Sequence, residues 1–161
     1  MKRILFFLAF LCFTTSNSQI NNLRELLVAS KLSLESLTEE LQYDGWSIER
    51  PTEKYKENGR KIVGTYSYTF NEKKQLLRRI ITMDTNDGTS VHTTNLIIKD
   101  KELFNLMVKN LPQNGYSLIK KSGNESLYND GRNAILLTEN YSQNTLGIGV
   151  YKISIILNAL E

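Results

Sequence analysis

Apolar residues recur at three- and four-residue spacing in two separate segments of the chain. One segment carries Leu34, Leu37 and Leu41, and the other carries Phe104, Met107 and Leu111. This spacing places the apolar side chains on one face of a helix. Ser30 and Asp100 precede the two segments as good N-cap residues, and the pairs Asp44-Gly45 and Asn114-Gly115 follow them. Because glycine adopts the left-handed backbone conformation at little cost, each pair predicts a helix end.

Most of the remaining chain alternates between apolar and polar residues, as half-buried strands do. Strands are predicted near 60–70, 75–84, 90–98, 132–140 and 146–157, with short alternating segments at 46–49 and 116–119. The pairs Asn58-Gly59 and Asp130-Gly131 are typical of tight hairpin turns. The connections are too short for parallel crossovers, so we expect antiparallel meanders. Residues 21–29 fit a helix or a strand end, and we favour a helix.

The two helical segments belong to a longer internal similarity. Residues 30–50 align without a gap onto residues 100–120, and the step Gly45-Trp46-Ser47 falls on Gly115-Tyr116-Ser117. Further apolar matches keep the same order along the chain, which favours a duplication. The sequence therefore predicts an α+β fold made of a tandem repeat of helix plus antiparallel β-meander. The two copies, 19–99 and 100–161, are expected to share one compact unit.

This repeated pattern, with its Gly-(Trp or Tyr)-Ser step, resembles a class of small exported bacterial proteins. In architecture it is similar to β-lactamase inhibitory protein and related envelope domains, over most of residues 22–157. The resemblance implies a duplicated α+β frame that presents a broad sheet. It implies no functional residue, because no binding motif of that family matches this chain.

The first 18 residues have the three parts of a cleavable secretory signal peptide. Basic Lys2 and Arg3 precede an apolar run from 4 to 13, and small polar residues up to Ser18 follow. The run is about half the roughly 20 residues that a membrane-spanning helix needs. We expect cleavage after Ser18 and a mature chain that starts at Gln19, is periplasmic or secreted, and has no integral membrane segment. Leu11 before Cys12 argues against lipid attachment at that cysteine.

Cleavage would change both charge and cysteine content. The chain has 20 basic and 17 acidic residues and a net charge of +3, which falls to +1 without Lys2 and Arg3. That near balance gives no reason to expect nucleic acid as a partner. Cys12 is the only cysteine, so the mature chain would have no disulfide and would depend on burial for its stability.

No catalytic or cofactor motif is recognisable. His92 is the only histidine, and its neighbours place it on a strand, where it is more often structural. The run Asp84 to Gly88 departs from the EF-hand pattern and fits a hairpin turn better. Close pairs of zinc ligands are lacking, and the pair Gly147 and Gly149 lacks the third glycine of a dinucleotide fingerprint. We therefore expect no enzyme activity, no metal and no cofactor.

Aromatic residues are the candidates for binding. Tyr66, Tyr68 and Phe70 alternate onto one face of a predicted strand, which favours packing under a helix but also fits a binding platform, since aromatics are enriched in interface hot spots. Arg78 and Arg79 on the next strand must face opposite sides. Trp46, Tyr66, Tyr68 and Tyr116 are the candidate residues of a binding surface or pocket.

Two functions fit these features. The first is a non-enzymatic binding protein that engages a protein partner through its sheet surface or loops. The alternative is a small-molecule or lipid carrier with a pocket between the helices and the sheet. A hydrolase that uses carboxylates alone, such as Asp84 with Asp87, is the third and weakest hypothesis.

Overall fold

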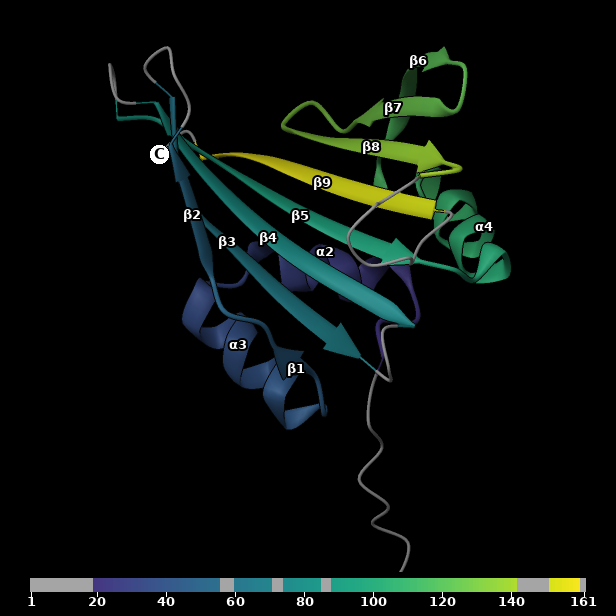
Figure 1. The fold of residues 1–161 in the computed structure, drawn as a ribbon. Coiled ribbons are helices and arrows are strands. Elements are labelled where there is room, and N and C mark those ends of the chain that lie inside the picture. Colours follow the sequence, from purple (N-terminus) through teal and green to yellow (C-terminus); the bar gives the residue numbers. More distant parts are fainter. Residues whose placement is uncertain (1–18, 56–59, 71–73, 85–87, 142–150, 160–161) are drawn as a thin grey trace, which may run out of the picture.

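The described residues of the computed structural model fold into one twisted antiparallel sheet with three α-helices (Figure 1). The structure describes residues 19–55, 60–70, 74–84, 88–141 and 151–159. The α+β class and the antiparallel sheet predicted from the sequence are confirmed. The predicted signal peptide and the pair Gly147 and Gly149 lie outside the described residues.

Nine strands form the sheet in the order β1-β3-β4-β5-β9-β8-β7-β6, and β2 also pairs with β3. Their bounds are β1 Ser47–Ile48, β2 Thr52–Tyr55, β3 Arg60–Phe70, β4 Gln75–Asp84, β5 Ser90–Ile98, β6 Ser117–Ser122, β7 Glu125–Asn129, β8 Asn133–Glu139 and β9 Tyr151–Ala159. The predicted strands correspond to β3, β4, β5, β8 and β9. The hairpin β6–β7 was not anticipated beyond its first residues, because its turn at Gly123 (φ +57°) is flanked by polar residues that mask the alternation.

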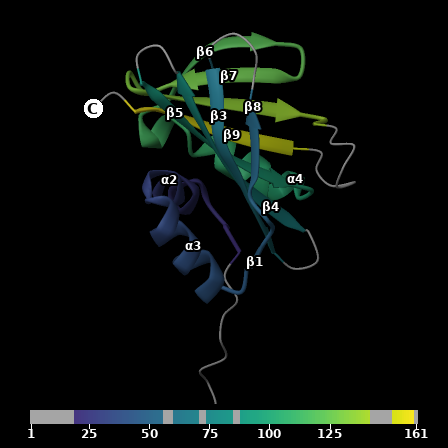
Figure 2. The ribbon, with the colours of Figure 1, turned by 60° about the vertical axis from the view of Figure 1, so that its left-hand side comes forward.

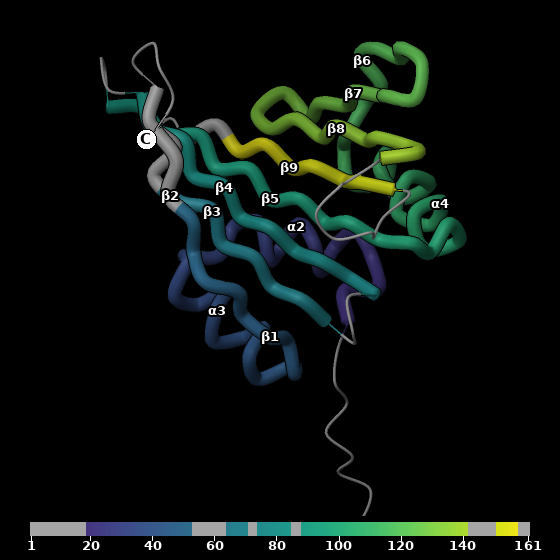
Figure 3. Tube along the Cα trace, viewed as in Figure 1, coloured from purple at the N-terminus to yellow at the C-terminus, as the bar shows by residue number. Residues whose placement is uncertain are grey.

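The last strands of the two predicted halves meet in the middle of the sheet. β5 and β9 pair antiparallel from Ser90 with Ala159 to Ile98 with Tyr151. One meander extends outward from each of them, so the predicted boundary between residues 99 and 100 falls between β5 and the next helix. The colour gradient of Figure 3 shows these two halves side by side. The duplication itself stays a prediction. The predicted turn at Asn58-Gly59 lies outside the described residues, whereas Asp130-Gly131 lies between β7 and β8, as expected for a hairpin turn.

The helices are α2 Leu23–Lys31, α3 Leu34–Tyr43 and α4 Lys101–Lys109, and a short 3₁₀ helix, Pro112–Asn114, follows α4. The helix favoured for residues 21–29 is therefore confirmed. Asp100 caps α4 as expected, its carboxylate accepting a hydrogen bond from Leu103 N at 3.0 Å. Ser30 was wrong as an N-cap: it lies inside α2, where its hydroxyl donates to Leu27 O. Ser33 caps α3 instead.

All three helices lie on the same face of the sheet (Figures 1 and 2). Their buried side chains join those of one sheet face in a single hydrophobic core, which includes Leu26, Leu37, Tyr68, Leu96, Phe104, Met107, Ile135 and Ile153. None of the described helices covers the opposite face. We call that opposite side, which carries the strand residues that alternate with the core residues, the helix-free face.

Both edges of the sheet carry features that disfavour pairing with another strand. The β1–β2 edge is interrupted at Glu49 to Pro51, and proline cannot donate a backbone hydrogen bond. The β6 edge has a register irregularity between Leu118 and Lys120, followed by Lys121. Interruptions, bulges and lysines are the usual protections of edge strands, so the faces of the sheet are better placed than its edges to bind a partner.

Candidate functional site

The four aromatic residues predicted as a binding surface or pocket lie at or against the core. Trp46, Tyr68 and Tyr116 expose 4%, 1% and 4% of their surface, and the partly buried Tyr66 packs against the same cluster. Trp46 packs on Phe70 with ring centroids 5.3 Å apart. These side chains therefore support the helix–sheet interface and do not form one exposed patch.

The hydroxyl groups of two of these tyrosines have hydrogen-bond partners within the protein. The Tyr68 hydroxyl lies 2.8 Å from the Thr38 hydroxyl on α3. Burial, followed by the charge and hydrogen bond of Asp130, raises the pKa of Tyr116 to about 12. The Tyr116 phenol therefore stays neutral and serves as a hydrogen-bond donor that joins the core to the β7–β8 turn.

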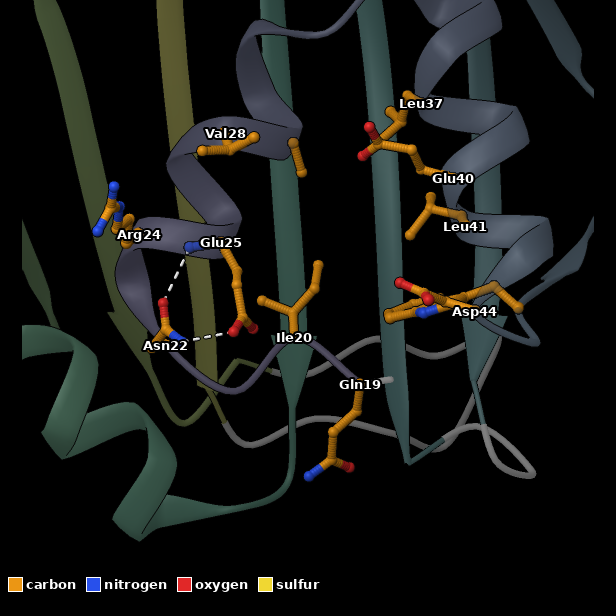
Figure 4. A pocket seen from close by; sticks show the side chains of 12 residues that line it. Gln19, Ile20, Asn22, Arg24, Glu25, Val28, Leu37, Glu40, Leu41 and Asp44 are labelled. Atoms are coloured by element: carbon orange, nitrogen blue, oxygen red, sulfur yellow. Dashed lines mark hydrogen bonds between the residues drawn. The ribbon is translucent and has the colours of Figure 1, made fainter. Parts of the chain in front are cut away.

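Trp46 also lines a pocket between α2, α3 and the start of the described chain (Figure 4). The pocket has a volume of about 290 Å³. Ile20, Leu37 and Leu41 supply apolar lining, whereas Glu25, Glu40, Asp44 and Arg24 are charged. The Glu25 carboxylate already has partners at the start of α2, because it accepts hydrogen bonds from Asn21 N and Asn22 Nδ2. Tyr66, Tyr68 and Tyr116 do not line this pocket.

A second concave site, which was not predicted from the sequence, lies on the helix-free face. This groove has a volume of about 370 Å³ and crosses the adjacent strands β4, β5, β9 and β8. We call it the sheet groove. Its lining residues are Arg78, Ile80, Thr82, Thr93, Asn95, Ile97, Leu136, Tyr141, Lys152, Ser154 and Ile156.

Strand register explains how these distant residues meet. Arg78 is paired with Asn95, Asn95 with Ser154 and Ser154 with Leu136, so one row crosses four strands. A neighbouring row joins Ile80, Thr93 and Ile156. Residues directly opposite in an antiparallel pair point to the same face, so each row presents its side chains together on the helix-free side.

Arg78 and Arg79 face opposite sides of β4, as their adjacency predicted. Arg78 lies in the sheet groove, where its Nε donates to the Ser67 hydroxyl at 3.4 Å. Arg79 is fully buried on the helix side and donates to Ala29 O at 2.7 Å and to Leu32 O at 3.3 Å. It thereby caps the C-terminus of α2, where a positive charge is favoured by the helix dipole.

Lys152 supplies the second cation of the sheet groove. Its Nζ lies 4.4 Å from the centroid of the Tyr141 ring, within the range of a cation–π contact. Tyr141 reaches this position directly after Asn140, whose positive φ of 52° turns the chain at the end of β8. Burial lowers the pKa of Lys152, and the negative charge of Glu125 partly opposes that shift. Lys152 is therefore a half-buried cation with reduced hydration.

The floor of the sheet groove is polar at its centre. Asn95 and Ser154 expose 8% and 5% of their surface and sit side by side in register. Isoleucines flank them in the neighbouring rows. An amide and a hydroxyl between two cations form a set of hydrogen-bond donors, and such convergent polar groups in a concave, largely apolar site are typical of binding sites.

His92 lines neither of these two pockets, and Asp84 lines a separate concavity of about 250 Å³ with Thr82, Thr89 and Val91. His92 lies on the helix side of β5, and burial, followed by the positive charge of Arg79, lowers its pKa. Asp84 belongs to the β4–β5 turn, where its N–H donates to Thr89 O and its carbonyl accepts from Gly88 N. Gly88 has a φ of +74°, as the turn interpretation expects. Asp87 lies outside the described residues.

Within the described part of the chain, no group of three or more histidine, cysteine or acidic residues is placed to hold a metal ion. Nor is any described helix long and apolar enough to cross a membrane. No protein-family model, curated protein or solved structure matches the chain.

Proposed function

We propose that the mature chain is an exported, non-enzymatic binding protein that engages a protein partner through its helix-free sheet face. The observation that supports this most is the sheet groove, which combines two cations, a polar floor and aliphatic sides on a face that none of the described helices covers. Export to the periplasm or the exterior rests on the signal-like residues 1–18.

Several features of the groove suit a partner. Aromatic and arginine side chains are enriched at binding hot spots, and the groove contains Tyr141 and Arg78. The strands that form its floor are held by the helix-side core, so binding needs little reordering of the backbone, which reduces its entropic cost. The shielded edges leave this face as the broadest regular surface that the described residues offer.

Site-specific photo-crosslinking tests the proposal directly. A photoreactive amino acid at Thr93, on the helix-free face, is expected to capture an envelope protein of the host. The matched control places it at Leu106, an exposed residue of α4 on the other side of the molecule. Capture from Leu106 alone, or from neither position in living cells, would count against the helix-free face as the binding surface.

The alternative function is a small-molecule carrier, and the pocket beside Trp46 is the observation that favours it. That pocket has three carboxylates and one arginine among its lining residues, so it suits a small cationic ligand better than a lipid. Native mass spectrometry of protein purified from its own host tests this. A bound small molecule that is lost in a Trp46→Ala variant would support the carrier, and consistently unliganded protein would contradict it.

A further inference from the structure

The start of the described chain is fixed to the rest of the protein within one residue of Gln19. Ile20 is buried, with 6% of its surface exposed, and its N–H and carbonyl are both hydrogen-bonded to the Gln75 side chain at 3.0 Å. The next residue, Asn21, donates its N–H to the Glu25 carboxylate at 2.7 Å. Because Gln19 is bonded directly to this segment, its backbone nitrogen lies within about 5 Å of the Ile20 Cα.

Gln19 and Ile20 both line the pocket beside Trp46. Figure 4 shows Ile20 between Glu25 on α2 and Asp44 at the end of α3, with Gln19 next to it. The backbone nitrogen of Gln19 is therefore held beside this pocket.

The pocket has an excess of negative charge. Its lining residues include three carboxylates, those of Glu25, Glu40 and Asp44, and one guanidinium, that of Arg24. Arg24 extends from the side of α2 that faces away from α3 (Figure 4). The guanidinium is therefore poorly placed to offset the two carboxylates on α3.

Those two carboxylates lie where negative charge is unfavourable. Glu40 is in the last turn of α3 and Asp44 is its C-cap residue, and this turn has no basic residue. The C-terminus of a helix carries the negative end of its dipole, which favours cations and disfavours anions. Like charges four residues apart on a helix also repel each other. A cation placed in the pocket beside Glu40 and Asp44 would offset both effects.

Cleavage after Ser18 would create such a cation. The peptide N–H of Gln19 in the uncleaved chain is neutral, whereas a free α-amino group has an ordinary pKa near 8 and is mostly protonated at neutral pH. The new charge would appear on the nitrogen that the contacts of Ile20 hold beside the pocket.

We propose that the α-ammonium group of Gln19 in the mature chain pairs with the carboxylates of Glu40 and Asp44 and joins the N-terminus to the end of α3. This inference rests on the export part of the proposed function, because only cleavage after Ser18 supplies the ammonium group. Processing then adds a contact that the precursor lacks. The protein's own cation also takes the place of a small cationic ligand, which favours partner binding over the carrier function.

The test compares two forms of the mature chain, residues 19–161, that differ only at Gln19. One form keeps the free α-amino group. In the other, made with a glutaminyl cyclase, the α-amino nitrogen has attacked the side-chain Cδ and released ammonia, which leaves an uncharged lactam. At neutral pH the free form is expected to unfold at a temperature about 1–3 °C higher. NMR titration should give its α-amino group a pKa above the ordinary value.

The Glu40→Gln/Asp44→Asn double variant should lose this difference between the two forms. The control Glu39→Gln, which removes an exposed carboxylate of α3 that does not line the pocket, should keep it. Equal unfolding temperatures for the two forms, or a difference that survives in the double variant, would overturn the inference.

N-terminal sequencing of the protein from its own host provides an independent check. A start at Gln19 would support the inference, and a start at any other residue would overturn it. Crosslinking of a partner from Thr93 does not involve the N-terminus, so the proposed binding function and this inference can fail separately.

Discussion

Neighbouring arginines on β4 show how one residue step changes the role of a side chain. Arg79 is buried against α2, where its guanidinium donates to two carbonyl groups, and its Nε has no hydrogen-bond partner in the described structure. Arg78 faces the other way and lines the sheet groove. The same type of side chain is thus buried against a helix at one position and lines the opposite face of the sheet at the next.

Arg79→Ala is expected to lower the free energy of unfolding by about 3 kcal/mol, because it leaves two carbonyls without a donor and removes packed volume. Arg78→Ala, the control on the opposite face, should cost less than about 1 kcal/mol. Urea unfolding followed by the fluorescence of Trp46 measures both values. Equal costs for the two variants would contradict the burial of Arg79.

The contact between Tyr116 and Asp130 predicts a dependence of stability on pH. Burial alone would raise the pKa of Asp130, but hydrogen bonds from the N–H groups of Asn133 and Arg132, the Asn133 side chain and the Tyr116 hydroxyl lower it below its ordinary value. Asp130 therefore contributes stability above its unfolded pKa, and this contribution is lost as pH falls through the folded value.

Tyr116 acts at the other end of the pH range. Its folded pKa of about 12 exceeds the ordinary value near 10, so its contribution is present below pH 10 and is lost as pH rises toward 12. Tyr116→Phe should remove the alkaline effect, reduce part of the acid effect and cost about 1 kcal/mol at neutral pH. Tyr128→Phe is the control. An unchanged alkaline profile in Tyr116→Phe would contradict this assignment.

At the scale of elements, a glutamine connects the beginning of the described chain to β4. Ile20 N donates to Gln75 Oε1, and Gln75 Nε2 donates to Ile20 O, both at 3.0 Å. Through these two bonds the Gln75 side chain pairs with the backbone of Ile20, in the way that the backbone of a neighbouring strand would. This contact holds the segment that leads into α2 against the sheet.

Gln75→Ala is expected to destabilise the protein by about 1–3 kcal/mol, because a buried N–H and a buried carbonyl lose their partners. Hydrogen exchange at the Ile20 amide should accelerate more than exchange in β9. Lys74→Ala, at the exposed neighbouring position, should change neither. Protection of the Ile20 amide that survives Gln75→Ala would show that another group satisfies it.

Local sequence patterns predicted most elements but not the sites. Leucine spacing located α3, and alternation located β3 to β5. Ser30 was mistaken for an N-cap because the pattern could not show that α2 continues to Lys31, which brings Ser33 to the start of α3. The sheet groove escaped prediction because Arg78 and Lys152 come to line one groove only through the pairing of β4, β5 and β9. The position of the Tyr141 side chain in the groove depends in addition on the positive φ of Asn140.

At the scale of the whole molecule, the β5–β9 pairing makes one sheet from two meanders. Ile155 is fully buried at this junction and pairs with Thr94 on β5 and Ile135 on β8. Loss of its side chain should therefore weaken both halves together.

Ile155→Ala is expected to cost about 2–4 kcal/mol, whereas Leu118→Ala on the exposed β6 edge should cost less than about 0.5 kcal/mol. Unfolding should remain a single transition in both variants, with Trp46 fluorescence and hydrogen exchange in β8 changing together. Separate transitions for the two reporters would show that the halves fold independently.

β9 is the last strand along the chain but lies between β5 and β8 in the sheet, and this determines the order in which the strands can pair. A chain that emerges from its N-terminus onward presents β5 long before β9, and β8 has no inner neighbour until β9 arrives. The two meanders can therefore join into one sheet only after β9, the last described strand, has emerged.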